Sequence, residues 1–103
     1  MYYTYMIRCE DNSIYTGITT DMERRFGEHR TQDKKGAKYT KSHKVTKIEA
    51  VWSSENRALA GKLEYHIKRL SKSEKENLIT DNCIEKLLFN KIEVEKYYRI
   101  KYN

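Results

Sequence analysis

The stretch "SIYTGITTDMERRFGEH", residues 13–29, changes from one hydrophobic pattern to another within a few positions. Its first part, "IYTGI", is rich in β-branched and aromatic residues, as is typical of a strand. Beyond the glycine, Thr20 and Glu23 have the spacing of a capping box, and Asp21 suits the positive end of a helix dipole. The stretch therefore predicts a strand that leads into a helix from about residue 21 to about residue 30.

Another strand precedes this one. Residues 2–8, "YYTYMIR", are also aromatic and β-branched, and "CEDNS" then supplies turn formers, so a β-hairpin is predicted. An antiparallel register whose paired residue numbers add to an even value would place Tyr5 and Tyr15 on one face of the sheet. An odd sum would separate them, and the turn sequence leaves both registers open.

One face of the predicted helix carries apolar and basic side chains together. Met22, Phe26 and His29 recur at helical spacing, and Arg25 lies beside them, four residues before His29. Because this face turns toward the sheet, Arg25 and His29 are expected to lie near the hairpin. The alternative is that they form the border between the buried and solvated sides of the helix.

The next part of the chain adds a basic segment, a strand and a longer helix. Residues 34–47 hold six lysines and no acidic residue, which predicts a basic loop, and residues 47–52, "KIEAVW", alternate as a strand does. Residues 53–70 begin with serines suited to cap a helix and carry leucine and isoleucine at helical spacing. Glu64 falls on the border of this apolar stripe, where a carboxylate is uncommon unless something pairs with it.

Two shorter helices are predicted after that, over residues 71–79 with a serine cap and near residues 83–91. The order ββαβα, followed by C-terminal elements, indicates the α+β class: a three-stranded antiparallel β-sheet flanked by α-helices. We expect a single domain in residues 1–79, with residues 80–103 as an extension that packs on it or flanks it.

Composition limits the class of partner. The 103 residues include 21 Lys and Arg against 15 Asp and Glu, a formal net charge of +6 that favours nucleic acid. Cys9 and Cys83 lie too far apart in sequence for a zinc or redox motif, which fits reduced thiols and a cytoplasmic location. No window approaches 18 apolar residues, so we expect neither a membrane span nor secretion.

The polar residues around the hairpin suit phosphodiester cleavage, which needs a fixed cation, an activated water and usually a divalent metal. The planar cation of Arg25 matches a phosphate group, and the single carboxylate of Glu64 could hold a largely hydrated Mg²⁺. A cation nearby would lower the pKa of Tyr5 or Tyr15, which could then accept a proton from water. His29 could act as a proton shuttle or hydrogen-bond donor.

These residue types also have structural interpretations. Hairpin tyrosines mostly pack against their neighbours, and Glu64 could pair with Lys68, four residues further on. Gly17 could let the backbone approach a phosphate closely, or it could simply end the strand.

"YTG", followed eight residues after its glycine by Arg25, resembles the second half of the GIY-YIG nuclease signature, and "YTY", residues 3–5, resembles the first half. The resemblance covers residues 2–79 and is to the small single-domain bacterial members of that family. The sequence departs from the pattern at Tyr3, Thr4 and Thr16, where the family has glycine, isoleucine and isoleucine. Threonine keeps the β preference, so the departures bear on the geometry near Tyr3 more than on the fold.

The resemblance implies a catalytic group made of Tyr5, Tyr15, Arg25 and His29. Within it, Arg25 would contact phosphate, and His29 occupies a position that the family fills with histidine or tyrosine. The resemblance further implies that Glu64 ligates Mg²⁺ or Mn²⁺. Asn77 is the nearest match to an asparagine that other members use after the metal-binding glutamate.

The expected function is that of a divalent-metal-dependent DNA endonuclease, structure-specific or preferring single strands, with a role in DNA repair or recombination. The nucleic-acid-binding residues would be Gly17, Lys38, Tyr39, Lys41 and Lys44. An alternative is a non-catalytic nucleic-acid-binding module on the same scaffold, and a third is a basic protein-interaction domain. A monomer or weak dimer is expected, guided by a separate targeting protein.

Overall fold

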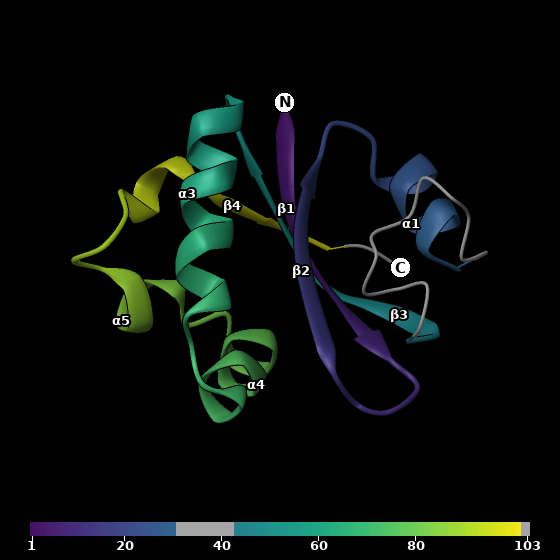
Figure 1. Ribbon diagram of the computed structural model, residues 1–103. Helices are drawn as coiled ribbons and strands as arrows, with labels where there is room; N and C mark the ends of the chain where they lie inside the picture. Colours follow the sequence, from purple (N-terminus) through teal and green to yellow (C-terminus); the bar gives the residue numbers. More distant parts are fainter. Residues whose placement is uncertain (31–42, 102–103) are drawn as a thin grey trace.

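The computed structural model describes residues 1–30 and 43–101. Its strands are β1 (Tyr2–Cys9), β2 (Ile14–Thr19), β3 (Val45–Ser54) and β4 (Tyr98–Ile100). Its helices are α1 (Met22–Arg30), α3 (Arg57–Lys68), α4 (Lys72–Asp81) and α5 (Ile84–Leu88), with a 3-10 turn η1 at Val94–Lys96. The strands form one antiparallel sheet in the order β2-β1-β3-β4, with α1 on one side and α3, α4 and α5 on the other (Figure 1). The predicted α+β class is confirmed.

Alternating side chains of the strands supply two hydrophobic cores, one on each face of the sheet. On the α3 side, Met6 and Trp52 pack with apolar residues of α3, α4 and α5. On the α1 side, Tyr5 and Ile7 pack with Met22 at the start of α1. Both faces are therefore covered, and the described helices include none that is long and apolar enough to cross a membrane.

The hairpin takes the register with an even sum. Tyr5 pairs with Gly17, and the residues on either side continue the same ladder. Tyr5 and Tyr15 consequently lie on the same face, the one that α1 covers, which settles the choice that the turn sequence left open.

The start of α1 differs from the predicted capping box. Asp21 is the residue that caps it, because its Oδ1 accepts a hydrogen bond of 3.1 Å from the backbone N of Arg24. The hydroxyl of Thr19 in turn accepts from the backbone N of Asp21, at 3.1 Å. The helix begins at Met22, one residue later than a Thr20–Glu23 box requires, so that box was wrong.

The serine caps predicted for the longer helix were wrong too. Ser53 and Ser54 are the last residues of β3, and the cap of α3 is Asn56, whose side chain accepts from the backbone N of Leu59 at 2.9 Å. The strand also starts earlier than expected, at Val45, and so includes the end of the predicted basic loop. By contrast, the serine cap of α4 is confirmed, since Ser71 forms a full capping box there.

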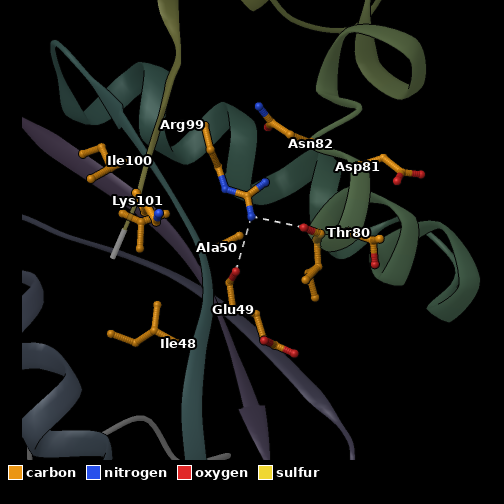
Figure 2. A pocket seen from close by; sticks show the side chains of 11 residues that line it. Ile48, Glu49, Ala50, Thr80, Asp81, Asn82, Arg99, Ile100 and Lys101 are labelled. Carbon is orange, nitrogen blue, oxygen red and sulfur yellow. Dashed lines mark hydrogen bonds between the residues drawn. The ribbon is translucent and has the colours of Figure 1, made fainter. Parts of the chain in front are cut away.

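In the part of the chain that the structure describes, the sheet has four strands where the sequence predicted three. The additional strand, β4, pairs with Val51–Ser53 of β3 and is only three residues long, too short to show a period. Its Arg99 lies over the ring of Trp52, 5.1 Å from the centroid. The same guanidinium donates to the carbonyls of Glu49 in β3 and Ile79 near the end of α4, at 3.4 and 3.1 Å (Figure 2). Residues after 79 thus complete both the sheet and the core, to which α5 contributes Ile84 and Leu88.

A half-buried arginine joins the hairpin to β3 and α4. The side chain of Arg8 is 13% exposed and pairs with Glu49 at 2.7 Å and with Glu76 at 2.6 Å. The hydrogen bonds from Arg8 lower the pKa of Glu76 to about 2, and the same pairing raises the pKa of Arg8. Three elements that are distant in sequence are held in one arrangement by this ion group.

Candidate active site

The hydroxyl of Tyr5 is the centre of the site. Tyr5 comes from β1 and is 1% exposed, and its Oη lies 2.8 Å from Nε2 of His29 at the end of α1. Nε of Arg25 donates to the same oxygen at 3.4 Å, which leaves the hydroxyl hydrogen free to point at Nε2. Arg25 is itself held by Glu28, whose Oε1 is 3.0 Å from Nη1. The helix face predicted to turn toward the hairpin does so.

Gly17 provides the space in which the Tyr5 ring lies. A Cβ at Gly17 would stand 2.5 Å from Oη and 2.7 Å from Cζ of Tyr5, and 3.1 Å from Cε2 of Tyr15. Gly17 lies inside β2, not at its end, so the interpretation as a strand terminator was wrong. The structure gives this glycine a packing role beside Tyr5.

Tyr15 completes a group of three rings. Its centroid is 6.4 Å from that of Tyr5 and 5.5 Å from that of His29, and Tyr5 and His29 are 5.6 Å apart. Each ring therefore contacts both others. The even register of the hairpin is what brings the two tyrosines together.

The opposite side of the site is contributed by α3, which lies across β2 from α1 (Figure 1). Nζ of Lys68 is 3.2 Å from Oε2 of Glu64 and 5.6 Å above the centre of the Tyr15 ring. The charge of Glu64 is close enough to raise the pKa of Tyr5. The predicted ion pair with Lys68 is confirmed, and it ties Glu64 to the tyrosines.

Burial dominates the electrostatics of the central pair. It raises the pKa of Tyr5 to about 12, although the hydrogen bond and charge of Arg25 act in the opposite direction. Burial, and then the charge of Arg25, lower the pKa of His29 to about 4. The expected lowering of the Tyr5 pKa by a nearby cation is present but is outweighed by burial, so the pKa of Tyr5 is raised overall, and both side chains are neutral at pH 7.

One departure from the signature has a structural explanation. Thr4, which replaces the isoleucine of the first half, is fully buried, and its Oγ1 donates to the carbonyl of Ala60 in α3 at 3.0 Å. This bond links β1 to the helix that carries Glu64. Tyr3 packs against the edge of the core on the α1 side, and Thr16 is 3% exposed within β2.

Several predicted site residues lie elsewhere. Asn77 is exposed on α4, and the contacts around Tyr5 in the described chain do not include it. Lys44 is exposed just before β3, with its carbonyl 2.7 Å from the backbone N of Glu10. Lys38, Tyr39 and Lys41 fall outside the described residues.

Sequence reasoning missed one member of the site, Glu28. It lies three residues after Arg25 and pairs with its guanidinium, at a helical spacing that could have identified it. This carboxylate offsets the charge of Arg25 beside Tyr5.

The carboxylate chemistry of the site suits a hydrated metal better than a cage of protein ligands. Residues 1–30 and 43–101 contain no group of three or more His, Cys, Asp or Glu side chains placed to hold a metal ion. Glu64 offers a single hard oxygen donor group with a side chain that is 24% exposed. Mg²⁺ is commonly held through one or two carboxylates while it keeps several waters, so Glu64 fits that mode.

Comparison with known proteins agrees with this arrangement. Residues 1–77 match the family described as the GIY-YIG catalytic domain. The UPF0213 protein FN1575 of Fusobacterium nucleatum is 48% identical over 94% of this chain and 98% of its own. UPF0213 protein YhbQ of Escherichia coli is 38% identical over 89% of this chain and 90% of its own.

A related solved structure covers most of the chain. The solution NMR structure of the UPF0213 protein BH0048 from Bacillus halodurans is 40% identical and covers 78% of this chain and 84% of its own, with a TM-score of 0.50. The two tyrosines, the arginine, the histidine and the glutamate that the resemblance implies as site residues lie around one site, and the family match covers three quarters of the chain. This chain belongs to the GIY-YIG catalytic domain family, alongside small bacterial UPF0213 proteins.

Proposed function

We propose that this protein is a divalent-metal-dependent endonuclease that hydrolyses phosphodiester bonds in DNA. The observation that carries the proposal is the convergence of β1, β2, α1 and α3 on one site, through Tyr5, Tyr15, Arg25, His29 and Glu64. Membership of a nuclease family supports the class of reaction, and the net charge of +6 supports a polyanionic substrate.

Arg25 is the group that would neutralise phosphate. It lies at the rim of the buried Tyr5–His29 pair, its side chain is 22% exposed, and two charged or polar partners fix its orientation. A guanidinium held in this way can offer its fork of N–H donors to phosphate oxygens without first being ordered. Removing it would also remove the cation that opposes the high pKa of Tyr5.

Tyr5 and His29 would handle the proton. A neutral imidazole next to a neutral phenol can accept the phenolic proton or hold it in a hydrogen bond. The distance of 2.8 Å between the two groups is short enough for such a transfer. Tyr15 lines the same group of rings and would orient the attacking water. Added positive charge near Tyr5 favours the phenolate, which is the form able to accept a proton from water.

Glu64 would hold the metal, with Lys68 as its partner when no metal is bound. A bound Mg²⁺ or Mn²⁺ would supply Lewis-acid stabilisation of the charge that develops on the phosphate. The Lys68 ammonium, which already lies over Tyr15, would remain as a second cation next to the site.

A cleavage assay on labelled duplex, single-stranded and branched DNA tests the proposal, with Mg²⁺, Mn²⁺ or chelator. We expect Arg25→Ala and Glu64→Gln each to lower the single-turnover rate about a hundredfold or more. Arg69→Ala and Glu85→Gln are matched controls at exposed positions outside the site. Full cleavage activity in both site variants would contradict the proposed endonuclease function of this site.

The substrate panel also separates the alternatives. We propose a preference for branched or single-stranded DNA and hence a role in cytoplasmic DNA repair or recombination, with targeting left to a partner protein. Salt-sensitive binding without cleavage, unchanged or improved by Glu64→Gln, would favour a non-catalytic nucleic-acid-binding module instead.

A further inference from the structure

A small hollow lies next to the site, between α1 and the first turn of α3. Its volume is about 310 Å³, and polar groups dominate its lining. Three arginines contribute to it: Arg24 and Arg25 from α1 and Arg57 at the first position of α3. Arg25 therefore lines this hollow with part of its side chain while its Nε bonds to Tyr5.

The three arginines of the hollow differ in how far nearby carboxylates neutralise their charge. Glu28 pairs with both arginines of α1, at 3.4 Å from Arg24 and 3.0 Å from Arg25. Arg24 also lies 3.9 Å from Asp21. Arg57 is exposed, and within residues 1–30 and 43–101 it makes no ion pair with a carboxylate. The excess positive charge of the hollow consequently resides mainly on Arg57.

We propose that Arg57 binds the backbone phosphate adjacent to the one at Tyr5 and Arg25. This inference rests on the proposed nuclease function. Arg25 belongs to both places, so a group bound in the hollow and a phosphate at Tyr5 would be neighbours. Consecutive phosphates along a nucleic-acid strand are spaced closely enough to occupy two such adjoining positions, and arginine is well suited to bind each of them.

The proposed contact of Arg57 predicts which class of substrate the site prefers. A site that binds two successive phosphates takes an internal phosphodiester of a polynucleotide strand, and it gains less from a mononucleotide ester, which offers only one. Arg57 is in this sense a positioning residue: it fixes the strand and leaves the reacting phosphate to Arg25 and Tyr5.

The test combines two ways of removing the same contact. One is Arg57→Ala, with Arg57→Lys as the charge-preserving variant and Arg69→Ala as the matched control. Arg69 is the residue that caps the C-terminal end of the same helix, twelve residues later and so about 18 Å further along the axis. The other is a set of single-stranded oligonucleotides that each carry one uncharged methylphosphonate linkage, moved stepwise along the strand. Affinity is measured by fluorescence anisotropy in chelator, and cleavage is mapped separately with Mg²⁺.

On the parent protein, one neutral linkage beside the cleaved bond should weaken binding about tenfold. Arg57→Ala should weaken binding of the native strand by a similar factor and lower the salt slope by about 0.7. The two losses should not add, because both remove the same contact, and Arg57→Lys should recover part of the affinity. Arg69→Ala should keep the full sensitivity to the neutral linkage.

The inference is overturned if every neutral linkage weakens binding to Arg57→Ala by the same factor as it weakens binding to the parent. Arg57 would then contact no phosphate. If the parent binds strands without cutting them, the proposed hydrolysis fails, yet the non-additivity still decides the role of Arg57. A parent that binds no strand at low salt would refute both.

Discussion

Substituting alanine for Gly17 tests the packing on which the site depends. The added Cβ would stand 2.5 Å from the Tyr5 oxygen, whereas ordinary contact begins at 3.4 Å, so the ring must retreat by 0.9 Å. A shift of this size is large enough to lengthen or break the 2.8 Å hydrogen bond between Tyr5 and His29. Overpacking a buried site costs about 1–3 kcal/mol, while the loss of glycine's freedom in the unfolded chain returns about 0.4–1 kcal/mol. The net expectation is a loss of about 1 kcal/mol.

Urea unfolding and single-turnover cleavage measure the two consequences of Gly17→Ala. The urea midpoint should fall by about 0.5 M, and misplacing the hydroxyl by nearly 1 Å should slow cleavage by about a hundredfold. Gly61→Ala is the control, since a Cβ there meets nothing within 4 Å and sits inside α3, where alanine stabilises a helix by about 1 kcal/mol. If Gly17→Ala were neutral or stabilising like Gly61→Ala, Tyr5 would not be packed as described and the argument would fail.

Further predictions concern stability. Because the pKa of His29 is about 4 in the folded state and about 6.5 in the unfolded state, unfolded chains bind the extra proton between those values. The free energy of unfolding should fall by about 3 kcal/mol as pH drops from 6.5 to 4. The prediction is contradicted if this free energy falls equally with pH in the parent and in His29→Gln. Arg8→Met removes the arginine partner of Glu49 and Glu76, each of which keeps only a lysine at 3.4 Å, and should cost about 2–3 kcal/mol. Most of this loss should be recovered when Glu49→Gln is added, and no recovery would mean that packing of the arginine stem is what stabilises. The lowered pKa of Glu76 contributes stability that is fully present above the pKa of the unfolded state and is lost as pH falls toward 2. This loss in acid should become smaller in Arg8→Met, where only Lys72 still lowers the pKa of Glu76. Thr4→Val keeps the shape of the side chain but removes its hydrogen bond to α3, so the free energy of unfolding should fall by about 1 kcal/mol. Thermal or urea unfolding measures this loss, and an unchanged midpoint would refute the prediction.

The elements that could be predicted from the sequence are those with a local cause. The hairpin follows from two β-branched runs around turn residues, and the face of α1 follows from its helical period. The cap at Ser71 follows from its spacing to Glu74. β4 has no such local cause, because three residues carry no period and its place is set by pairing with β3. The cap at Asn56 was missed because β3 runs on through two serines that look like caps.

The same distinction applies to the candidate site. Arg25 and His29 could be placed together from one helix, and Glu64 could be noticed as a carboxylate on an apolar border. The role of Gly17 could not be predicted, because it depends on which residue lies opposite in the hairpin, and the turn did not fix that register. Likewise, the raised pKa of Tyr5 depends on how deeply the ring is buried, which a residue pattern does not reveal.

The protonation states of the central pair suggest how the site is activated. With Glu28 beside Arg25, the local charge near Tyr5 is almost balanced, and burial keeps its pKa near 12 and that of His29 near 4. A phenol and an imidazole in these neutral forms are stable without substrate but are poor acceptors of a proton from water at pH 7. In the proposed mechanism, net positive charge would therefore arrive before Tyr5 acts as a base, and Glu64 would be the side chain that recruits it. Replacing Glu28 by glutamine would release the charge of Arg25 toward the phenol and should lower the pKa of Tyr5, measurable by ultraviolet titration. A pKa that stayed the same or rose in this variant would show that Glu28 does not restrain the site.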